Sequence, residues 1–188
     1  MVNVDLYKAY FDYAKEYGYS YSMSFKEHKF FSYNTLIGKQ YRGKEGKRIL
    51  FVNICYFSST SSSHVCTLVK KAVDENITII PFVGKKDMRN ITVEEVKADL
   101  TRRVLEAINE DSLGYLRYSR AKKEFIYLMN SVIDFSTYIE PLDIPPKAYE
   151  IADNLCDSEY VEKHLPKAVR ISKDNFQIDH TVDIIDIG

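Results

Sequence analysis

Two apolar runs lie on either side of a polar loop in the first half of the chain. Phe30–Tyr41 and Arg48–Phe57 are rich in aromatic and β-branched residues, and residues 42–47 between them carry two glycines and four charges. Two apolar runs around a polar loop that contains glycine predict a β-hairpin. Both alternating faces of Arg48–Phe57 are largely apolar, which predicts a central strand covered on both sides.

A period of three to four residues predicts helices on both sides of this hairpin. Six consecutive hydroxyl residues precede the second helix and place its N-cap between Ser58 and Ser61. Thr92 and Glu95 have the spacing of a capping box, and Gly18 is positioned to end the first helix. The predicted helices cover residues 4–17, 58–73, 92–110, 112–134, 146–154 and 159–165.

Three further stretches have strand patterns. Residues 19–25 alternate as a half-buried strand does, and residues 77–83 form a short apolar run in which Pro81 indicates an edge or a strand end. Residues 175–188 fit either an edge strand or a tail. The predicted fold class is α+β, with a small antiparallel sheet around the 30–57 hairpin, packed helices and a mostly helical C-terminal half. We expect a single domain over residues 1–188, with a subdivision into 1–83 and 84–188 left open.

Charge is distributed unevenly along the chain. The net charge is −1, but residues 1–123 hold 21 Lys and Arg against 14 Asp and Glu, and residues 124–188 hold 5 against 13. This asymmetry indicates either a basic binding surface with an acidic tail, or two parts that pack against each other. The chain has 15 tyrosines and no tryptophan. Tyrosine is favoured at recognition surfaces, although the composition also fits an AT-rich coding sequence.

Motifs of metabolic enzymes are absent from the sequence. It has no Gly-rich phosphate loop, GxSxG or HExxH, so we expect no cofactor and no catalytic residues of those classes. Asp179, His180, Asp183 and Asp186 do not share one face convincingly, and we expect no metal site. Three widely spaced cysteines, no secretory leader and no long apolar run predict a reduced, cytoplasmic protein (within a host cell) with no membrane partner.

Two segments carry a family resemblance. Ser32–Ile37 (SYNTLI) and Tyr56–His64 (YFSSTSSSH) resemble a segment of small uncharacterised phage and mobile-element proteins, in which an SYxTxI strand precedes a YSxTTSxHQ strand-to-helix turn. The likeness covers about 40 residues, and this chain departs from it at Ser62–Val65. The resemblance implies a phage or plasmid setting, where many small proteins bind host nucleic acid or host defence proteins.

The start of the predicted second helix is the first candidate site. Free N–H groups and a partial positive charge suit a phosphate there, with basic residues of the hairpin loop nearby. A second basic stretch, residues 117–123, interleaves tyrosine with positive charge, as phosphate contact and base stacking require. Both stretches also fit ordinary solvated surfaces. The candidate binding residues are Lys39, Arg42, Lys44, Lys47, Arg48, Ser61, Ser62, His64, Arg117, Arg120 and Lys123.

These features favour a binding protein over an enzyme. The leading hypothesis is a phage or mobile-element protein that binds nucleic acid, or a host nucleoprotein defence complex, through a basic, tyrosine-rich surface. In one alternative, the acidic region 134–188 binds protein as a nucleic-acid mimic. In another, the chain is a small nuclease that uses His64 as general acid or base.

Overall fold

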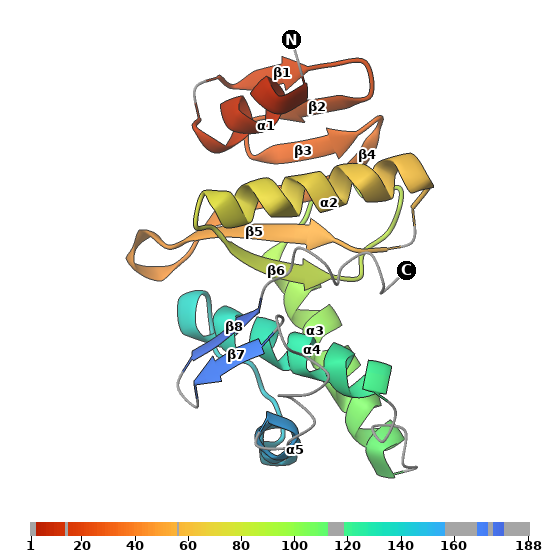
Figure 1. Ribbon diagram of the computed structural model, residues 1–188, viewed down its shortest axis with the longest axis vertical. Helices are drawn as coiled ribbons and strands as arrows, with labels where there is room; N and C mark the ends of the chain where they lie inside the picture. The colour runs from red at the N-terminus through yellow and green to blue at the C-terminus, as the bar shows by residue number, and fades with distance from the viewer. Residues whose placement is uncertain are drawn as a thin grey trace. The chain divides into compact units, whose positions relative to one another are not determined.

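The first unit of the structure is built on a six-stranded sheet, and the second is mainly helical (Figure 1). The computed structural model describes residues 3–13, 15–55, 57–112, 119–156, 169–172 and 175–178. Among these residues the two compact units comprise 3–96 and 97–178. The α+β class and the helical C-terminal half are confirmed, and the prediction of a single domain stays a prediction.

The strands of the sheet follow one another in chain order. Each of the first five pairs antiparallel with its neighbour, and the hairpin of β4 and β5 confirms the predicted one. β5 lies between β4 and β6 and is buried on both faces, as predicted for a central strand. The strands are β1 (Tyr17–Tyr19), β2 (Met23–Lys26), β3 (Lys29–Ser32), β4 (Thr35–Arg42), β5 (Arg48–Asn53) and β6 (Thr78–Phe82).

The predicted first arm of the hairpin is two strands rather than one. The chain turns back at Tyr33 and Asn34, between β3 and β4. Tyr33 has a φ of 52°, in the left-handed region that is rare for an aromatic residue. The turn therefore has no glycine or proline that would reveal it in the sequence, and the aromatic run continues through it.

The first helix is shorter than predicted. α1 (Asn3–Phe11) ends before Tyr13, whose φ of 51° is incompatible with a continuing helix. Gly18 lies in β1 and does not end the helix. A Cβ atom at Gly18 would stand 2.5 Å from Phe25 Cε1 and 2.9 Å from Leu6 Cδ1, so a glycine lets α1 and β2 side chains approach the strand. The predicted strand 19–25 is divided between β1 and β2.

The last strand makes the sheet mixed and not purely antiparallel. α2 (Ser59–Asp74) connects β5 to β6, and a helical crossover returns the chain to the same end of the sheet, so β6 pairs parallel with β5. The Ser58 side chain accepts a hydrogen bond from Ser61 N at 3.3 Å, which confirms the predicted cap. Among the described strands β6 lies at one edge of the sheet, which is one of the two positions that Pro81 indicated.

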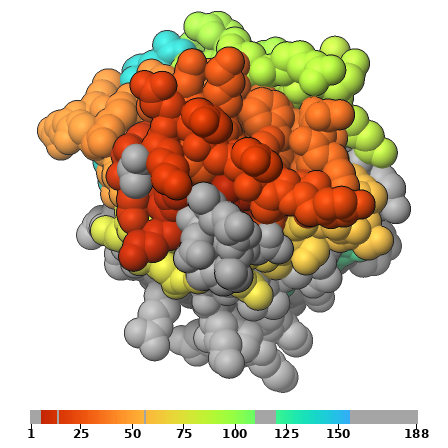
Figure 2. Space-filling model, turned by 90° about the horizontal axis from the view of Figure 1, so that it is seen from above, coloured from red at the N-terminus to blue at the C-terminus, as the bar shows by residue number. Residues whose placement is uncertain are grey.

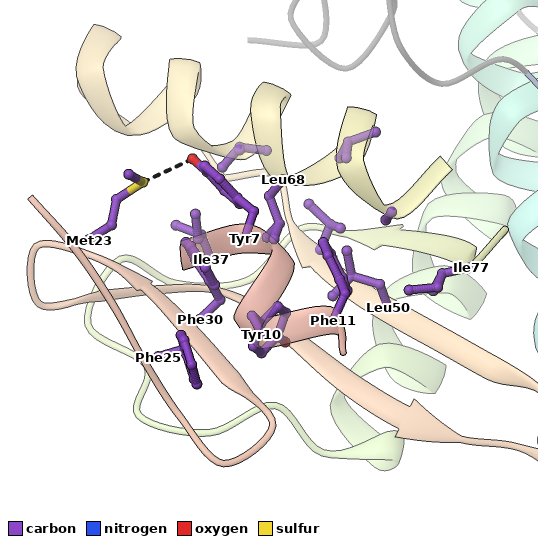
Figure 3. Packing of buried hydrophobic residues seen from close by; sticks show 14 of the residues in the cluster. Tyr7, Tyr10, Phe11, Met23, Phe25, Phe30, Ile37, Leu50, Leu68 and Ile77 are labelled. Carbon is purple, nitrogen blue, oxygen red and sulfur yellow. Dashed lines mark hydrogen bonds between the residues drawn. The ribbon is translucent and has the colours of Figure 1, made fainter. Parts of the chain in front are cut away.

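The main core of the first unit lies between the sheet and the helices α1 and α2 (Figure 3). The Tyr7 ring stacks on Phe30 at 5.0 Å between centroids, and Tyr10 contacts Phe30 edge-on at 5.1 Å. The Tyr7 hydroxyl donates a hydrogen bond to Met23 Sδ at 2.9 Å, and burial raises the pKa of Tyr7 to about 12. A Cβ atom at Gly38 would stand 2.7 Å from Leu68 Cδ2, so α2 lies directly against β4.

The second unit contains mainly helices. The Thr92 and Glu95 side chains each accept a hydrogen bond from the other residue's backbone N–H. This confirms the predicted capping box at the start of α3. α4 contacts α5 and β8, and β8 pairs only with β7 among the described residues. The predicted helix 159–165 lies outside them. The elements are α3 (Val93–Ser112, beginning in the first unit), α4 (Ser119–Tyr138), α5 (Pro146–Cys156), β7 (Val169–Ser172) and β8 (Asn175–Ile178).

Two adjacent phenylalanines of β3 test which face of the sheet is buried under the helices. Phe30 is 0% exposed, and its neighbour Phe31 is half-buried on the opposite face. We expect Phe30→Ala to lower the free energy of unfolding by about 3–5 kcal/mol and Phe31→Ala by less than about half of that. Urea unfolding followed by circular dichroism measures both. Equal losses would contradict the assignment of the two faces.

Candidate functional site

Three lysines lie side by side on the sheet face opposite to α1 and α2. Lys26 pairs directly with Lys29, and Lys29 pairs directly with Lys39. Directly paired residues point to the same face, and adjacent strands are about 4.8 Å apart. The three side chains, here called the lysine row, therefore line up across β2, β3 and β4.

The neighbouring row of residues shows which face this is. Gly18, Phe25, Phe30 and Gly38 pair in the same way, one position along each strand. Leu6 of α1 and Leu68 of α2 occupy the space above the two glycines. Successive residues of a strand point to opposite faces, so the lysine row lies on the face opposite to α1 and α2. This face is exposed at Lys26 and buried at Phe51, the residue that pairs with Lys39.

Electrostatic repulsion acts within the lysine row. Burial and then the positive charge of Lys29 lower the pKa of Lys39, while Glu95 acts in the opposite direction. Lys39 Nζ donates hydrogen bonds to Asn90 Oδ1 at 3.0 Å and to Ile91 O at 2.8 Å. Within the described part of the chain, the ammonium groups of Lys26 and Lys29 have no hydrogen bond or ion pair to offset their repulsion.

Aromatic side chains stand beside the lysine row on the same face. Tyr17 pairs with Lys26 and extends the row onto β1. Tyr19 pairs with Ser24, and Ser24 pairs with Phe31. Tyr17 and Tyr19 are 69% and 74% exposed. Seen from the side of β1, the red and orange atoms of these N-terminal strands lie at the surface (Figure 2).

A second basic cluster lies at the start of β5. The guanidinium carbons of Arg42 and Arg48 stand 5.7 and 5.3 Å from the centre of the Tyr13 ring, which is the geometry of a cation–π contact. Arg48 also donates hydrogen bonds to Phe11 O and to Gln40 Oε1. We call Tyr13, Arg42 and Arg48 the arginine–tyrosine cluster. It is held to the end of α1.

The hairpin loop beside this cluster carries the remaining predicted basic residues. Lys44 is exposed and Lys47 is half-buried. Arg42 donates a hydrogen bond to Gly46 O at 3.3 Å, which fixes the guanidinium over the loop. Four of the predicted binding residues, Arg42, Lys44, Lys47 and Arg48, are thus brought together, while Lys39 belongs to the lysine row.

A cluster of hydroxyl groups surrounds His64 at the start of α2. Ser32 Oγ is hydrogen-bonded to Ser61 Oγ at 2.8 Å and to His64 Nδ1 at 2.7 Å. Ser22 Oγ lies 3.5 Å from His64 Nε2, and Ser62 is half-buried in the same turn. Ser32 of the first segment and residues 61–64 of the second therefore meet in space, although 20 residues (38–57) separate Ile37 from Ser58 along the chain.

The hydroxyl cluster orients His64, but among the described residues no carboxylate is hydrogen-bonded to its ring. Burial lowers the pKa of His64, so the neutral imidazole is favoured near pH 7. The described residues contain no group of three or more His, Cys, Asp or Glu side chains that could hold a metal ion. The nuclease hypothesis gains no partner group from this arrangement.

The hairpin loop and the helix start do not lie together, in contrast to our expectation. The loop precedes β5 and α2 follows it (Figure 1). A strand of this length spans about 17–20 Å. A single phosphate group therefore cannot contact both.

The second predicted basic stretch is in the other unit. Arg120 forms an ion pair with Glu124 at 2.9 Å, and Lys123 Nζ stands 5.8 Å from the centre of the Tyr127 ring. Both contacts lie along α4. Arg117 lies outside the described residues, as do Asp179, His180, Asp183 and Asp186 of the acidic C-terminal region.

Sequence reasoning missed the lysine row and the tyrosines beside it. Lys26 and Lys29 flank a turn and look like ordinary charged loop residues in the sequence. Only the pairing of three strands brings them into line with Lys39. The alternation of residues 19–25 placed Tyr19 on the same face as Met23 and Phe25, which is wrong. Tyr19 pairs with Ser24 and lies on the opposite face, because the chain turns between β1 and β2.

Comparisons with protein-family models, curated protein sequences and solved structures find no match to this chain. Among the described residues, no helix has both the length and the apolar character needed to cross a bilayer.

The buried position of His64 predicts a pH-dependent stability. The pKa of His64 in the folded chain lies below its ordinary value of 6.5, so the unfolded chain binds this proton more readily. The contribution to the free energy of unfolding is fully present above pH 6.5 and is lost as the pH falls through the lowered pKa. We expect His64→Gln to lose less stability than the wild type between pH 7 and more acidic values, measured by urea unfolding. Identical pH profiles of the two proteins would contradict this prediction.

Proposed function

We propose that this chain acts by binding nucleic acid, with the lysine row contacting phosphate groups. The observation that carries the proposal is the direct pairing of Lys26 with Lys29 and of Lys29 with Lys39. Like charges directly opposite each other destabilise a sheet by a few tenths of a kcal/mol or more. An anionic ligand with regularly spaced charges removes this repulsion.

The composition of the open face supports a nucleic acid over a small anion. The row extends across three strands, so it matches a ligand with several phosphates along its length. Tyr17 continues the row with an aromatic ring. Basic residues interleaved with aromatic residues are typical of surfaces that contact both phosphates and bases.

The arginine–tyrosine cluster supports the same function from the end of the hairpin. Stacking on the Tyr13 ring and the hydrogen bond to Gly46 hold Arg42 in place without neutralising its charge. Lys44 in the exposed loop adds a second cation. A preorganised guanidinium loses little side-chain entropy when it binds a phosphate.

The resemblance of residues 32–37 and 56–64 to segments of phage and mobile-element proteins supports a host target. A nucleoprotein complex contains nucleic acid, so the lysine row has the same phosphate chemistry to recognise there. Binding to such a complex, as an inhibitor, is therefore part of the proposal.

Charge reversal in the lysine row tests the proposal. We expect Lys26→Glu/Lys29→Glu to weaken binding to labelled RNA or DNA roughly ten-fold or more at low salt, and to reduce the salt slope of log K by about 1–2. Fluorescence anisotropy over a salt series measures both quantities.

The matched control reverses two lysines of α2, Lys70→Glu/Lys71→Glu, on the other side of the sheet. It changes the net charge equally, so unequal losses would separate a local contact from a general charge effect. Equal binding by wild type and the Lys26/Lys29 variant would refute the lysine row as the phosphate site. Cleavage of the labelled strand, checked on a gel, would favour the alternative hypothesis of a nuclease that uses His64.

A further inference from the structure

We infer that the open face of β1–β3 binds single-stranded nucleic acid, with bases stacked on Tyr17, Tyr19 and Phe31 beside the lysine row. This inference rests on the proposed function and names its substrate class. It depends on where the aromatic rings lie relative to the paired lysines.

The edge strand β1 carries two exposed tyrosines, which follow each other along the strand axis. Tyr17 and Tyr19 are two residues apart, so their Cα atoms are separated by about 6.8 Å and their side chains point to the same face. This separation is about twice the ~3.4 Å rise per nucleotide in a stacked strand. Both rings are more than two-thirds exposed, so their faces are accessible to bases.

A second row across the strands adds a third ring. Tyr19 pairs with Ser24, and Ser24 pairs with Phe31, which is half-buried. Tyr19 and Phe31 are thus two strand spacings apart, or about 9.6 Å between their Cα atoms. The small side chain of Ser24 leaves space between the two rings.

The two rows place phosphate contacts beside base contacts. Tyr17, Lys26, Lys29 and Lys39 form one row, and Tyr19, Ser24 and Phe31 begin the next. Cations and rings are therefore separated by about two residues along each strand. A strand with unstacked bases can use both rows, because its backbone and its bases are independently accessible.

A duplex does not meet these requirements. Its bases are already stacked and paired, and their edges are reached by a helix or a two-stranded ribbon that enters the major groove. The row of phosphate-binding lysines remains available to a duplex, but the rings of Tyr17 and Tyr19 have no exposed base to contact. The open face therefore favours single strands through its aromatic residues and binds both forms through its lysines.

The free edge of β1 is consistent with this mode of binding. Glu27 N donates to Glu16 O and Ser20 N donates to Met23 O, so the hydrogen-bonding positions of Glu16 and Ser20 face β2. By alternation, the backbone groups of Tyr17 and Tyr19 point away from β2. Among the described residues, no strand pairs with this outer side of β1, so a base can also meet free N–H and C=O groups there.

Replacing the two exposed tyrosines tests the inference on the full-length chain. We expect Tyr17→Leu/Tyr19→Leu to weaken binding of a short labelled single strand roughly ten-fold or more, and to leave binding of the duplex of the same sequence unchanged. Because the protein has no tryptophan, its intrinsic fluorescence reports on tyrosine. The single strand should quench this emission in the wild type and quench it less in the variant.

A matched control removes an exposed tyrosine elsewhere. Tyr33→Leu changes a ring that lies 6.3 Å from the His64 ring at the start of α2, and we expect no change in single-strand affinity. Circular dichroism confirms that each variant is folded.

The outcomes separate this inference from the proposed function. Unchanged single-strand affinity of the Tyr17/Tyr19 variant, or equal affinity of the wild type for single strand and duplex, would overturn the inference. If Lys26→Glu/Lys29→Glu still weakened binding in that case, the proposed function would stand without it. Absence of any binding by the wild type at low salt would overturn both.

Discussion

The packing of two helices on one face of the sheet determines what the other face can do. α2 approaches β4 so closely that a Cβ atom at Gly38 would meet Leu68, and α1 does the same at Gly18. Helices at this distance bury Phe25 and Phe30 completely. Because strand residues alternate between faces, the residues next to each of these are directed to the opposite face. The lysine row and its tyrosines follow from this constraint.

Local signals in the sequence predicted those parts of the fold that depend on local chemistry. Ser58 caps α2 through a hydroxyl contact within its own turn, and Thr92 and Glu95 exchange hydrogen bonds across three residues. Such contacts involve neighbours in the chain and can be read from spacing alone. The turns at Tyr13 and Tyr33 could not, because both residues adopt a left-handed conformation that aromatic residues rarely take.

The candidate site was predictable only where its residues are close in the chain. Arg42 and Arg48 face each other across one hairpin, and their proximity follows from the loop between them. Lys26, Lys29 and Lys39 require two successive pairings, one of which has a register shift between Phe30 and Phe31. A shift of one residue would direct the lysines toward the core. Register between several strands is a tertiary property, and hydrophobic pattern alone does not determine it.

The hydroxyl cluster around His64 and the lysine row differ in how many of their polar groups have hydrogen-bond partners. This difference indicates a structural role for the first and a binding role for the second. Ser32 is hydrogen-bonded to both Ser61 and His64, and Ser22 contacts the other nitrogen of the His64 ring, so the cluster fixes the turn at Ser32 against α2. In the lysine row, the described structure compensates only Lys39, through Asn90 and Ile91. A cluster whose polar groups are hydrogen-bonded to one another stabilises the fold without a ligand. Like charges without counter-charges destabilise the fold, and an anion that binds to them removes this repulsion. The sheet face, and not the helix start that the sequence first suggested, is therefore the better candidate for a binding surface.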